Sequence, residues 1–100
     1  MSKFLIWLAS GCSDLSEVAG ALKAGGHEIG VLLVQDGVFL ADKGCPYSKG
    51  LKALGVKVYA SKRHLEERGI SGRLAVNVTV VDYPDMVHLI MESYEKTISL

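Results

Sequence analysis

Two cysteines are the residues of this chain whose types and neighbours best suit nucleophilic chemistry. Cys12 follows an apolar run, and Cys45 lies between Gly44 and Pro46. Each precedes a predicted helix, and a helix N-terminus lowers the pKa of a thiol and favours the reactive thiolate. Glycine and proline indicate an exposed loop, so we predict that Cys45 is the stronger candidate. Cys12 is the weaker one, because we expect it to pack at the end of a buried strand.

Four further residues are predicted to support a thiolate at Cys45. Lys43 and Lys49 are close to it in the sequence and carry positive charges, while Asp36 and Gly37 form a turn after a long apolar run. A helix N-terminus alone contributes about 0.3–1 kcal/mol, which is well under one pKa unit. The lysines or a partner subunit would therefore have to supply the rest of the stabilisation.

The spacing of the two cysteines gives no sign of a structural metal site. It matches neither a Cys-x-x-Cys pair nor a zinc pattern. We therefore expect free thiols in a cytoplasmic protein. The first twelve residues resemble a secretory signal only faintly, since their apolar core is short and is needed as a strand. The alternative for either cysteine is a loop or packing residue without chemical function.

Two other kinds of site are conceivable where strands end. The Ser-Gly-Cys-Ser segment at residues 10–13 precedes a helix, where backbone N–H groups favour phosphate, but its glycine spacing matches no phosphate loop. Asp14, Asp36 and Asp82 each follow a strand and could gather around a metal ion. Aspartate is also the ordinary helix-capping residue, which explains all three. We expect neither a metal nor a cofactor.

The amino-acid composition indicates which kinds of binding partner the chain could have. The 100 residues suit one domain, residues 1–100, and 49% of them are hydrophobic. Lys plus Arg and Asp plus Glu number 11 each, which gives no electrostatic reason to bind nucleic acid or an anionic membrane. No apolar run approaches the ~20 residues of a membrane span. The near-zero net charge leaves association with other protein subunits unopposed.

Apolar runs without alternation predict the centre of the fold. Residues 29–34 read Ile-Gly-Val-Leu-Leu-Val, and residues 4–9 are similarly apolar. Such runs are typical of parallel strands covered on both faces. A glycine free to take a positive φ, Gly37, then ends the central run. Further strands are predicted at residues 56–60, at residues 76–81 near an edge, and at residues 97–100.

Helical patterns separate these strands. The first helix is predicted to start at Asp14 with a capping box to Glu17, and the second covers residues 46–54 with Cys45 as its N-cap. The third covers residues 61–68. The fourth starts at Pro84, and its apolar stripe comprises Val87, Ile90, Met91 and Tyr94. Alternating strands and helices imply parallel pairing and a three-layer α/β/α sandwich.

Four motifs in order resemble the DsrH/TusB family of sulfur-relay proteins, within the DsrE/DsrF/DsrH superfamily. The resemblance covers roughly residues 28 to 100. It is carried by Gln-Asp-Gly-Val at 35–38, Val-Lys-Val-Tyr-Ala at 56–60, Leu-Glu-Glu-Arg-Gly-Ile at 65–70 and Val-Val-Asp-Tyr at 80–83. Each motif is weak alone, but their order and spacing are fairly specific.

The resemblance implies a five-stranded, mainly parallel domain that works in an oligomer. Relatives assemble with DsrE/TusD-like and DsrF/TusC-like subunits, and some superfamily members form homo-oligomers. These complexes carry persulfide sulfur toward 2-thiolation of a tRNA wobble uridine or within dissimilatory sulfur oxidation. They are sulfur carriers more than enzymes with a turnover of their own. We predict that Val38, Phe39 and Leu40, an apolar run after a turn, contact other subunits.

The family cysteines do not carry over to this chain. The cysteine in the first helix of some DsrH-type members corresponds to Gly20, and the DsrE/TusD cysteine after the third strand falls in Tyr-Ala-Ser-Lys at residues 59–62. Either the chain is a non-catalytic subunit, or Cys45 or Cys12 has taken over the role. Two readings from other classes stay open: a stand-alone module that binds a nucleotide-like ligand, and a purely structural oligomerisation subunit.

Overall fold

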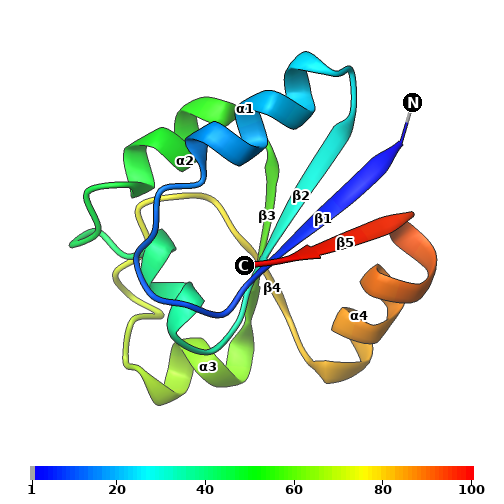
Figure 1. Ribbon diagram of the computed structural model, residues 1–100. Helices are drawn as coiled ribbons and strands as arrows, with labels where there is room; N and C mark the ends of the chain where they lie inside the picture. The colour runs from blue at the N-terminus through cyan, green and yellow to red at the C-terminus, as the bar shows by residue number, and fades with distance from the viewer. Residues whose placement is uncertain (1) are drawn as a thin grey trace.

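The computed structural model describes residues 2–100 as a five-stranded parallel sheet with helices on both faces (Figure 1). The strand order is β4-β3-β2-β1-β5, and every neighbouring pair is parallel. The strands are β1 (Lys3–Leu8), β2 (Glu28–Leu33), β3 (Lys57–Ser61), β4 (Thr79–Val81) and β5 (Lys96–Ser99). The predicted parallel sheet, with the first two strands inside it and β4 at an edge, is confirmed.

The unbroken apolar runs of β1 and β2 are explained by burial on both faces of the sheet. Successive side chains of a strand point to opposite faces, yet Leu5 and Ile6 are both fully buried. Leu5 packs in one core cluster and Ile6 in the other. Ile6 lies beside Val31 of β2, which in turn lies beside Val58 of β3. The central strands therefore tie the two cores together.

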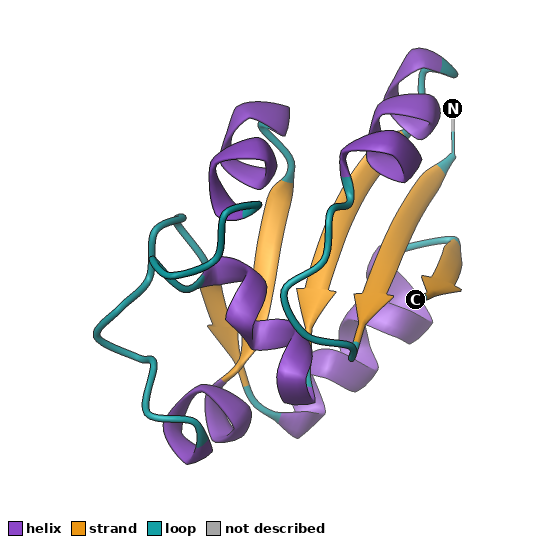
Figure 2. Ribbon diagram, turned by 60° about the vertical axis from the view of Figure 1, so that its left-hand side comes forward, coloured by secondary structure: helices purple, strands orange, loops and turns teal. Residues whose placement is uncertain are grey.

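The two faces of the sheet are covered unequally (Figure 2). The larger core lies beneath α1 (Ser16–Ala24), the 3-10 segment η1 (Gln35–Ala41), α2 (Ser48–Leu54) and α3 (Lys62–Glu67). The smaller core lies beneath α4 (Tyr83–His88) and the π-helical turn η2 (Leu89–Ser93). This is the predicted three-layer sandwich. Among residues 2–100, no helix has both the length and the apolar character needed to span a membrane.

The predicted apolar stripe of the last helix is partly wrong. Val87 and Met91 are 41% and 74% exposed, whereas Leu89 is buried. The π-helical turn begins at Leu89 and rotates the positions that follow, which accounts for Met91 but not for Val87, which precedes it in α4. Ile90 and Tyr94 do pack against the smaller core. Val87 and Met91 are therefore left on the outer surface of this layer.

Gly37 is needed for a different reason from the predicted one. The positive φ in this turn, 49°, belongs to Gln35, and Gly37 has no such conformation. A Cβ atom at Gly37 would instead lie 2.0 Å from the carbonyl oxygen of Leu8. Only glycine lets η1 cross so close to the end of β1. This crossing fixes the path of the chain toward Cys45.

Candidate functional site: the cysteine pair

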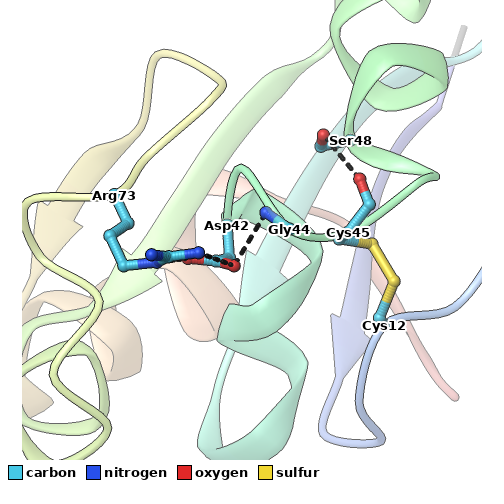
Figure 3. Close-up of a disulfide and its surroundings, with 6 residues drawn as sticks. All are labelled: Cys12, Asp42, Gly44, Cys45, Ser48 and Arg73. Atoms are coloured by element: carbon cyan, nitrogen blue, oxygen red, sulfur yellow. Dashed lines mark hydrogen bonds and ion pairs between the residues drawn. A yellow bond between two sulfur atoms is a disulfide. The ribbon is translucent and has the colours of Figure 1, made fainter.

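Cys12 and Cys45 are joined by a disulfide, with their Cα atoms 5.9 Å apart (Figure 3). The prediction of free thiols is therefore wrong. Cys12 lies in the loop after β1, and Cys45 lies between η1 and α2, beyond the end of β2. Because β1 and β2 are adjacent and parallel, the segments that follow them start at the same edge of the sheet. The fold thus brings the two cysteines together.

The loop that carries Cys45 is held by Asp42. The Asp42 carboxylate accepts a hydrogen bond from the backbone N–H of Gly44 at 2.9 Å and pairs with Nε of Arg73 at 2.9 Å. The backbone carbonyl oxygen of Asp42 accepts a hydrogen bond from the backbone N–H of Cys45 at 3.0 Å. The bond from Arg73 outweighs the effect of burial and holds the pKa of Asp42 below its ordinary value. These contacts fix the loop independently of the disulfide.

The exposures of the two cysteines are the reverse of those predicted. Cys45 is only 6% exposed and belongs to the larger core cluster, whereas Cys12 is exposed. Glycine and proline marked the loop at Cys45 correctly, but this loop packs inward, where the Ser48 hydroxyl donates to the Cys45 carbonyl oxygen at 2.9 Å. Nor is Cys45 an N-cap, because α2 begins at Ser48 and Tyr47 precedes it as N-cap.

The loop that carries Cys12 is held differently. In the part of the chain that the structure describes, residues 10–13 take part in no hydrogen bond with other protein atoms. Asp14 does not form the predicted capping box with Glu17. Its carboxylate accepts bonds from the N–H and hydroxyl of Ser16, at 2.9 and 2.7 Å, which lower the pKa of Asp14. The disulfide is thus the main bond between this loop and the rest of the domain.

A shallow pocket of about 440 Å³ lies beside the disulfide. It is lined by Cys12, Phe39, Asp42, Gly44, Cys45 and Pro46. All four predicted supporting residues are absent from this lining: Lys43, Lys49, Asp36 and Gly37. Sequence reasoning missed Asp42, although the Asp-Lys-Gly order at residues 42–44 is typical of a turn in which aspartate bonds the backbone two residues on.

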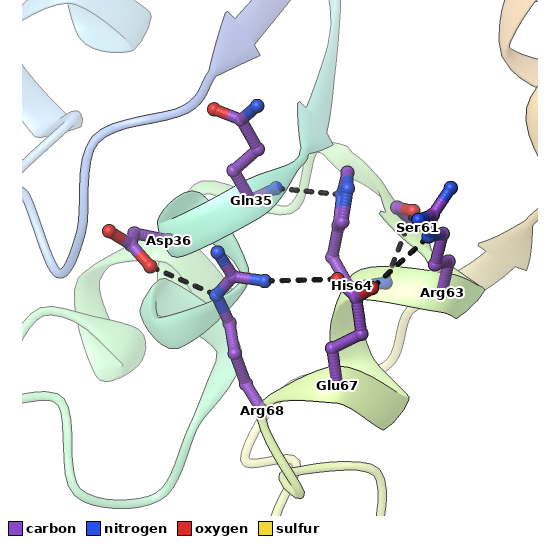
Figure 4. A network of polar contacts seen from close by, with 7 residues as sticks. All are labelled: Gln35, Asp36, Ser61, Arg63, His64, Glu67 and Arg68. Carbon is purple, nitrogen blue, oxygen red and sulfur yellow. Dashed lines mark hydrogen bonds and ion pairs between the residues drawn. The ribbon is translucent and has the colours of Figure 1, made fainter.

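Asp36 belongs to a second polar network at the ends of β2 and β3 (Figure 4). Its carboxylate pairs with Nε of Arg68 at 2.9 Å. The strained Gln35 donates its N–H to Nδ1 of His64 at 2.8 Å, and the N–H of His64 contacts the hydroxyl of Ser61 at 3.5 Å. These contacts hold η1 against α3, so Asp36 has a visible structural role.

Of the predicted subunit contacts Val38, Phe39 and Leu40, the first and last are buried within the chain itself, while Phe39 is half-buried and lines the pocket beside the disulfide. Val38 and Leu40 are 0% and 1% exposed, and Phe39 packs against the larger core. The run is apolar because η1 folds back over the sheet. Large exposed apolar side chains lie instead on the α4–η2 layer: Tyr83, Val87 and Met91.

Among residues 2–100, no group of three or more His, Cys, Asp or Glu side chains is arranged so that it could hold a metal ion. The three aspartates considered from the sequence are engaged separately. Asp82 caps α4 by accepting a bond from the N–H of Asp85 at 3.2 Å. Asp36 pairs with Arg68, and Asp14 bonds Ser16.

Comparison with known proteins places both cysteines inside a recognised domain. A family model described as DsrH like protein matches residues 11–96. The chain belongs to the DsrH family. The two cysteines of this DsrH-family chain fall within the matched region, together with every element from α1 to α4.

Curated relatives of this DsrH-family chain include Protein TusB from Escherichia coli O1:K1 / APEC, which is 36% identical over 75 residues, or 75% of this chain and 79% of that protein. Protein TusB from Photorhabdus laumondii subsp. laumondii is 34% identical over 79 residues, or 79% of this chain and 81% of that protein. The crystal structure of ychN protein from Escherichia coli matches with a TM-score of 0.81 over 100% of both chains. At 19% identity, this last likeness shows a shared fold.

Proposed function

We propose that this DsrH-family chain is a cytoplasmic subunit of a sulfur relay that serves tRNA wobble-uridine 2-thiolation. Membership of the DsrH family carries this proposal, and the relatives named TusB favour tRNA thiolation over sulfur oxidation. The cysteine pair at the carboxyl edge supports a role in sulfur chemistry. The alternative of a nucleotide-binding module is not favoured.

Sulfur enters the chain through a cysteine thiolate. The thiolate attacks the outer sulfur of a donor persulfide, the donor leaves as a thiolate, and the acceptor cysteine becomes a persulfide. Both cysteines must first be reduced, because neither sulfur is nucleophilic within the disulfide. Cys12 is exposed and Cys45 is 6% exposed, so the structure supports Cys12 as the cysteine that meets the donor. Cys45, the stronger candidate from sequence, takes the inner position.

Intact mass after sulfur loading tests the carrier role. The Cys45→Ser variant is reduced, freed of reductant and incubated with a cysteine desulfurase and cysteine. We expect a gain of one sulfur atom that a reductant reverses. A variant in which serine replaces both cysteines is the matched control and should gain none. Undetectable loading of every cysteine-containing form, even with partner subunits present, would make the chain a structural subunit.

We further propose that the chain assembles with DsrE/TusD-like and DsrF/TusC-like subunits, and with copies of itself when produced alone. The exposed side chains of Tyr83, Val87 and Met91 on the α4–η2 layer support a contact there with another subunit of this fold. The same layer borders an apolar hollow of about 350 Å³ that Trp7 and Ile90 help to line. Light scattering that gives a monomer mass at high micromolar concentration would remove the homomeric form of the proposal.

A further inference from the structure

We infer that Cys12 and Cys45 form a discharge pair, in which the Cys45 thiolate attacks a persulfide on Cys12 and releases its outer sulfur as sulfide. The inference rests on the proposed function, because it needs sulfur to reach Cys12. It assigns to Cys45 a reaction separate from sulfur acceptance. The disulfide in the structure is then the product of this reaction.

The distance between the cysteines permits the reaction without movement of the sheet. Their Cα atoms are 5.9 Å apart, within the usual range of about 4.4–6.8 Å for a disulfide. The inner sulfur of a Cys12 persulfide is the Cys12 sulfur itself. The loops therefore already place this atom where the Cys45 sulfur can bond to it. The shallow pocket of about 440 Å³ beside the pair leaves room for the departing sulfur.

The atoms and electrons of the step balance without an external oxidant. A bond forms between the Cys45 sulfur and the inner sulfur on Cys12, and the bond between the inner and outer sulfurs breaks. The outer sulfur leaves with the electron pair as hydrosulfide, and the proton lost by Cys45 passes to solvent. The cysteine sulfurs are oxidised to a disulfide, and the outer sulfur is reduced to sulfide. A dithiol reductant of the thioredoxin class would then restore the two thiols.

The different anchoring of the two cysteines decides when discharge can occur. Cys45 is buried on a loop fixed by Asp42 and Arg73, whereas the described contacts of residues 10–13 include no protein hydrogen bond. Once reduced, the Cys12 loop can turn toward a partner subunit while Cys45 stays in place. A persulfide held by the partner is then out of reach of Cys45. A persulfide left without a partner returns to Cys45 and is discharged.

The proposed compartment supports this interpretation of the disulfide. Cytosolic disulfides are usually transient bonds of catalytic or redox-sensing cysteines, because cellular reductants keep other thiols reduced. A relay subunit of the cytoplasm would thus carry such a bond as a reaction state. The exposure of Cys12 gives reductants access to the bond.

The test uses the full-length chain and glutathione persulfide as the probe. Wild type, Cys45→Ser, Cys45→Ala and Cys12→Ser proteins are reduced, desalted without oxygen and treated with one equivalent of probe whose outer sulfur is a heavy isotope. The intact mass of each protein is measured by mass spectrometry without reductant. Released sulfide is trapped chemically, and its amount and isotope are measured by mass spectrometry. A Ser13→Ala variant keeps both thiols and is the matched control. Circular dichroism checks that each reduced protein is folded.

We expect wild type and Ser13→Ala to lose two hydrogen atoms and release one heavy sulfide per chain. Both Cys45 variants should instead keep one added heavy sulfur and release at least tenfold less sulfide. If wild type keeps its persulfide as long as the Cys45 variants do, the inference fails while the carrier role stands. If no form gains or releases heavy sulfur, both fail. A reduced wild-type chain that is unfolded would make the disulfide a permanent structural bond and would also overturn the inference.

Discussion

Replacement of Gly37 by alanine should destabilise the domain through one close contact. The new Cβ would lie 2.0 Å from the carbonyl oxygen of Leu8, whereas real Cβ atoms essentially never come closer than 3.0 Å to another atom. Both sides of the clash are backbone, so η1 or the end of β1 must move. The same Leu8 oxygen accepts a hydrogen bond from the N–H of Val34 at 3.0 Å, and movement would weaken that bond.

The size of the effect follows from three opposing contributions. Overpacking costs about 1–3 kcal/mol, and a weakened backbone hydrogen bond adds about 0.5–1.5 kcal/mol. Alanine also reduces the conformational freedom of the unfolded chain, which stabilises the folded state by about 0.4–1 kcal/mol. The net loss for Gly37→Ala is therefore about 0.5–4 kcal/mol, with a central value of about 2 kcal/mol. With a urea m-value of about 1–3 kcal/mol per molar, a loss of about 2 kcal/mol lowers the unfolding midpoint by about 0.7–2 M.

Gly50→Ala is the matched control, because the added Cβ meets nothing within 4 Å and Gly50 has no positive φ. It lies in α2, so alanine should leave stability unchanged or raise it by about 0.4–1 kcal/mol. Urea unfolding followed by circular dichroism compares both variants with the oxidised wild type. A Gly37→Ala protein as stable as the Gly50→Ala control would refute the reasoning from the close contact.

Three other predictions follow from features of the site and its surroundings. Asp42→Asn should lower the free energy of unfolding by about 0.5–1 kcal/mol at neutral pH. The loss is small because Arg73, the partner of Asp42 in the ion pair, is largely exposed. The pKa of Asp42 in the folded protein is below its ordinary value of 3.8. The stability difference between wild type and Asp42→Asn should therefore decline as the pH falls below 3.8 and vanish below the folded-state pKa. Urea unfolding at several pH values would show this. Replacing Cys12 and Cys45 together by alanine should cost about 2–4 kcal/mol in urea unfolding yet leave a folded domain; unchanged stability would contradict a bond that restricts the unfolded chain. Met91→Glu should shift light-scattering masses toward monomer without changing circular dichroism, and an unchanged mass would place the contact elsewhere.

The sheet could be predicted from the sequence because its signal is local. The apolar runs that became β1 and β2 show no alternation, and burial on both faces is the physical cause. The same kind of signal misled at Val38 and Leu40. An apolar run after a turn does not say whether the chain folds back over the sheet or faces solvent, and η1 folds back.

The sequence predicts the position of each cysteine in the fold, but it does not predict the disulfide between them. The sequence predicts each residue just before a helix, yet the spacing of the two carries no information on pairing. The burial of Cys45 and the exposure of Cys12 depend on how two loops pack, which is set by distant residues such as Arg73. Likewise, the π-helical turn that exposes Met91 has no signature in the apolar spacing.

The short outer strands of the sheet protect the protein from uncontrolled polymerisation. An open sheet presents unpaired N–H and C=O groups along its outermost strands, which can template another chain, and natural proteins limit this hazard with short, charged edges. Here β4 has three residues, and β5 has four and begins with Lys96. Little backbone is thus available for a neighbouring chain to extend the sheet. Subunits that meet this protein are directed to the side chains of its helical layers, where the contact is finite and can be specific.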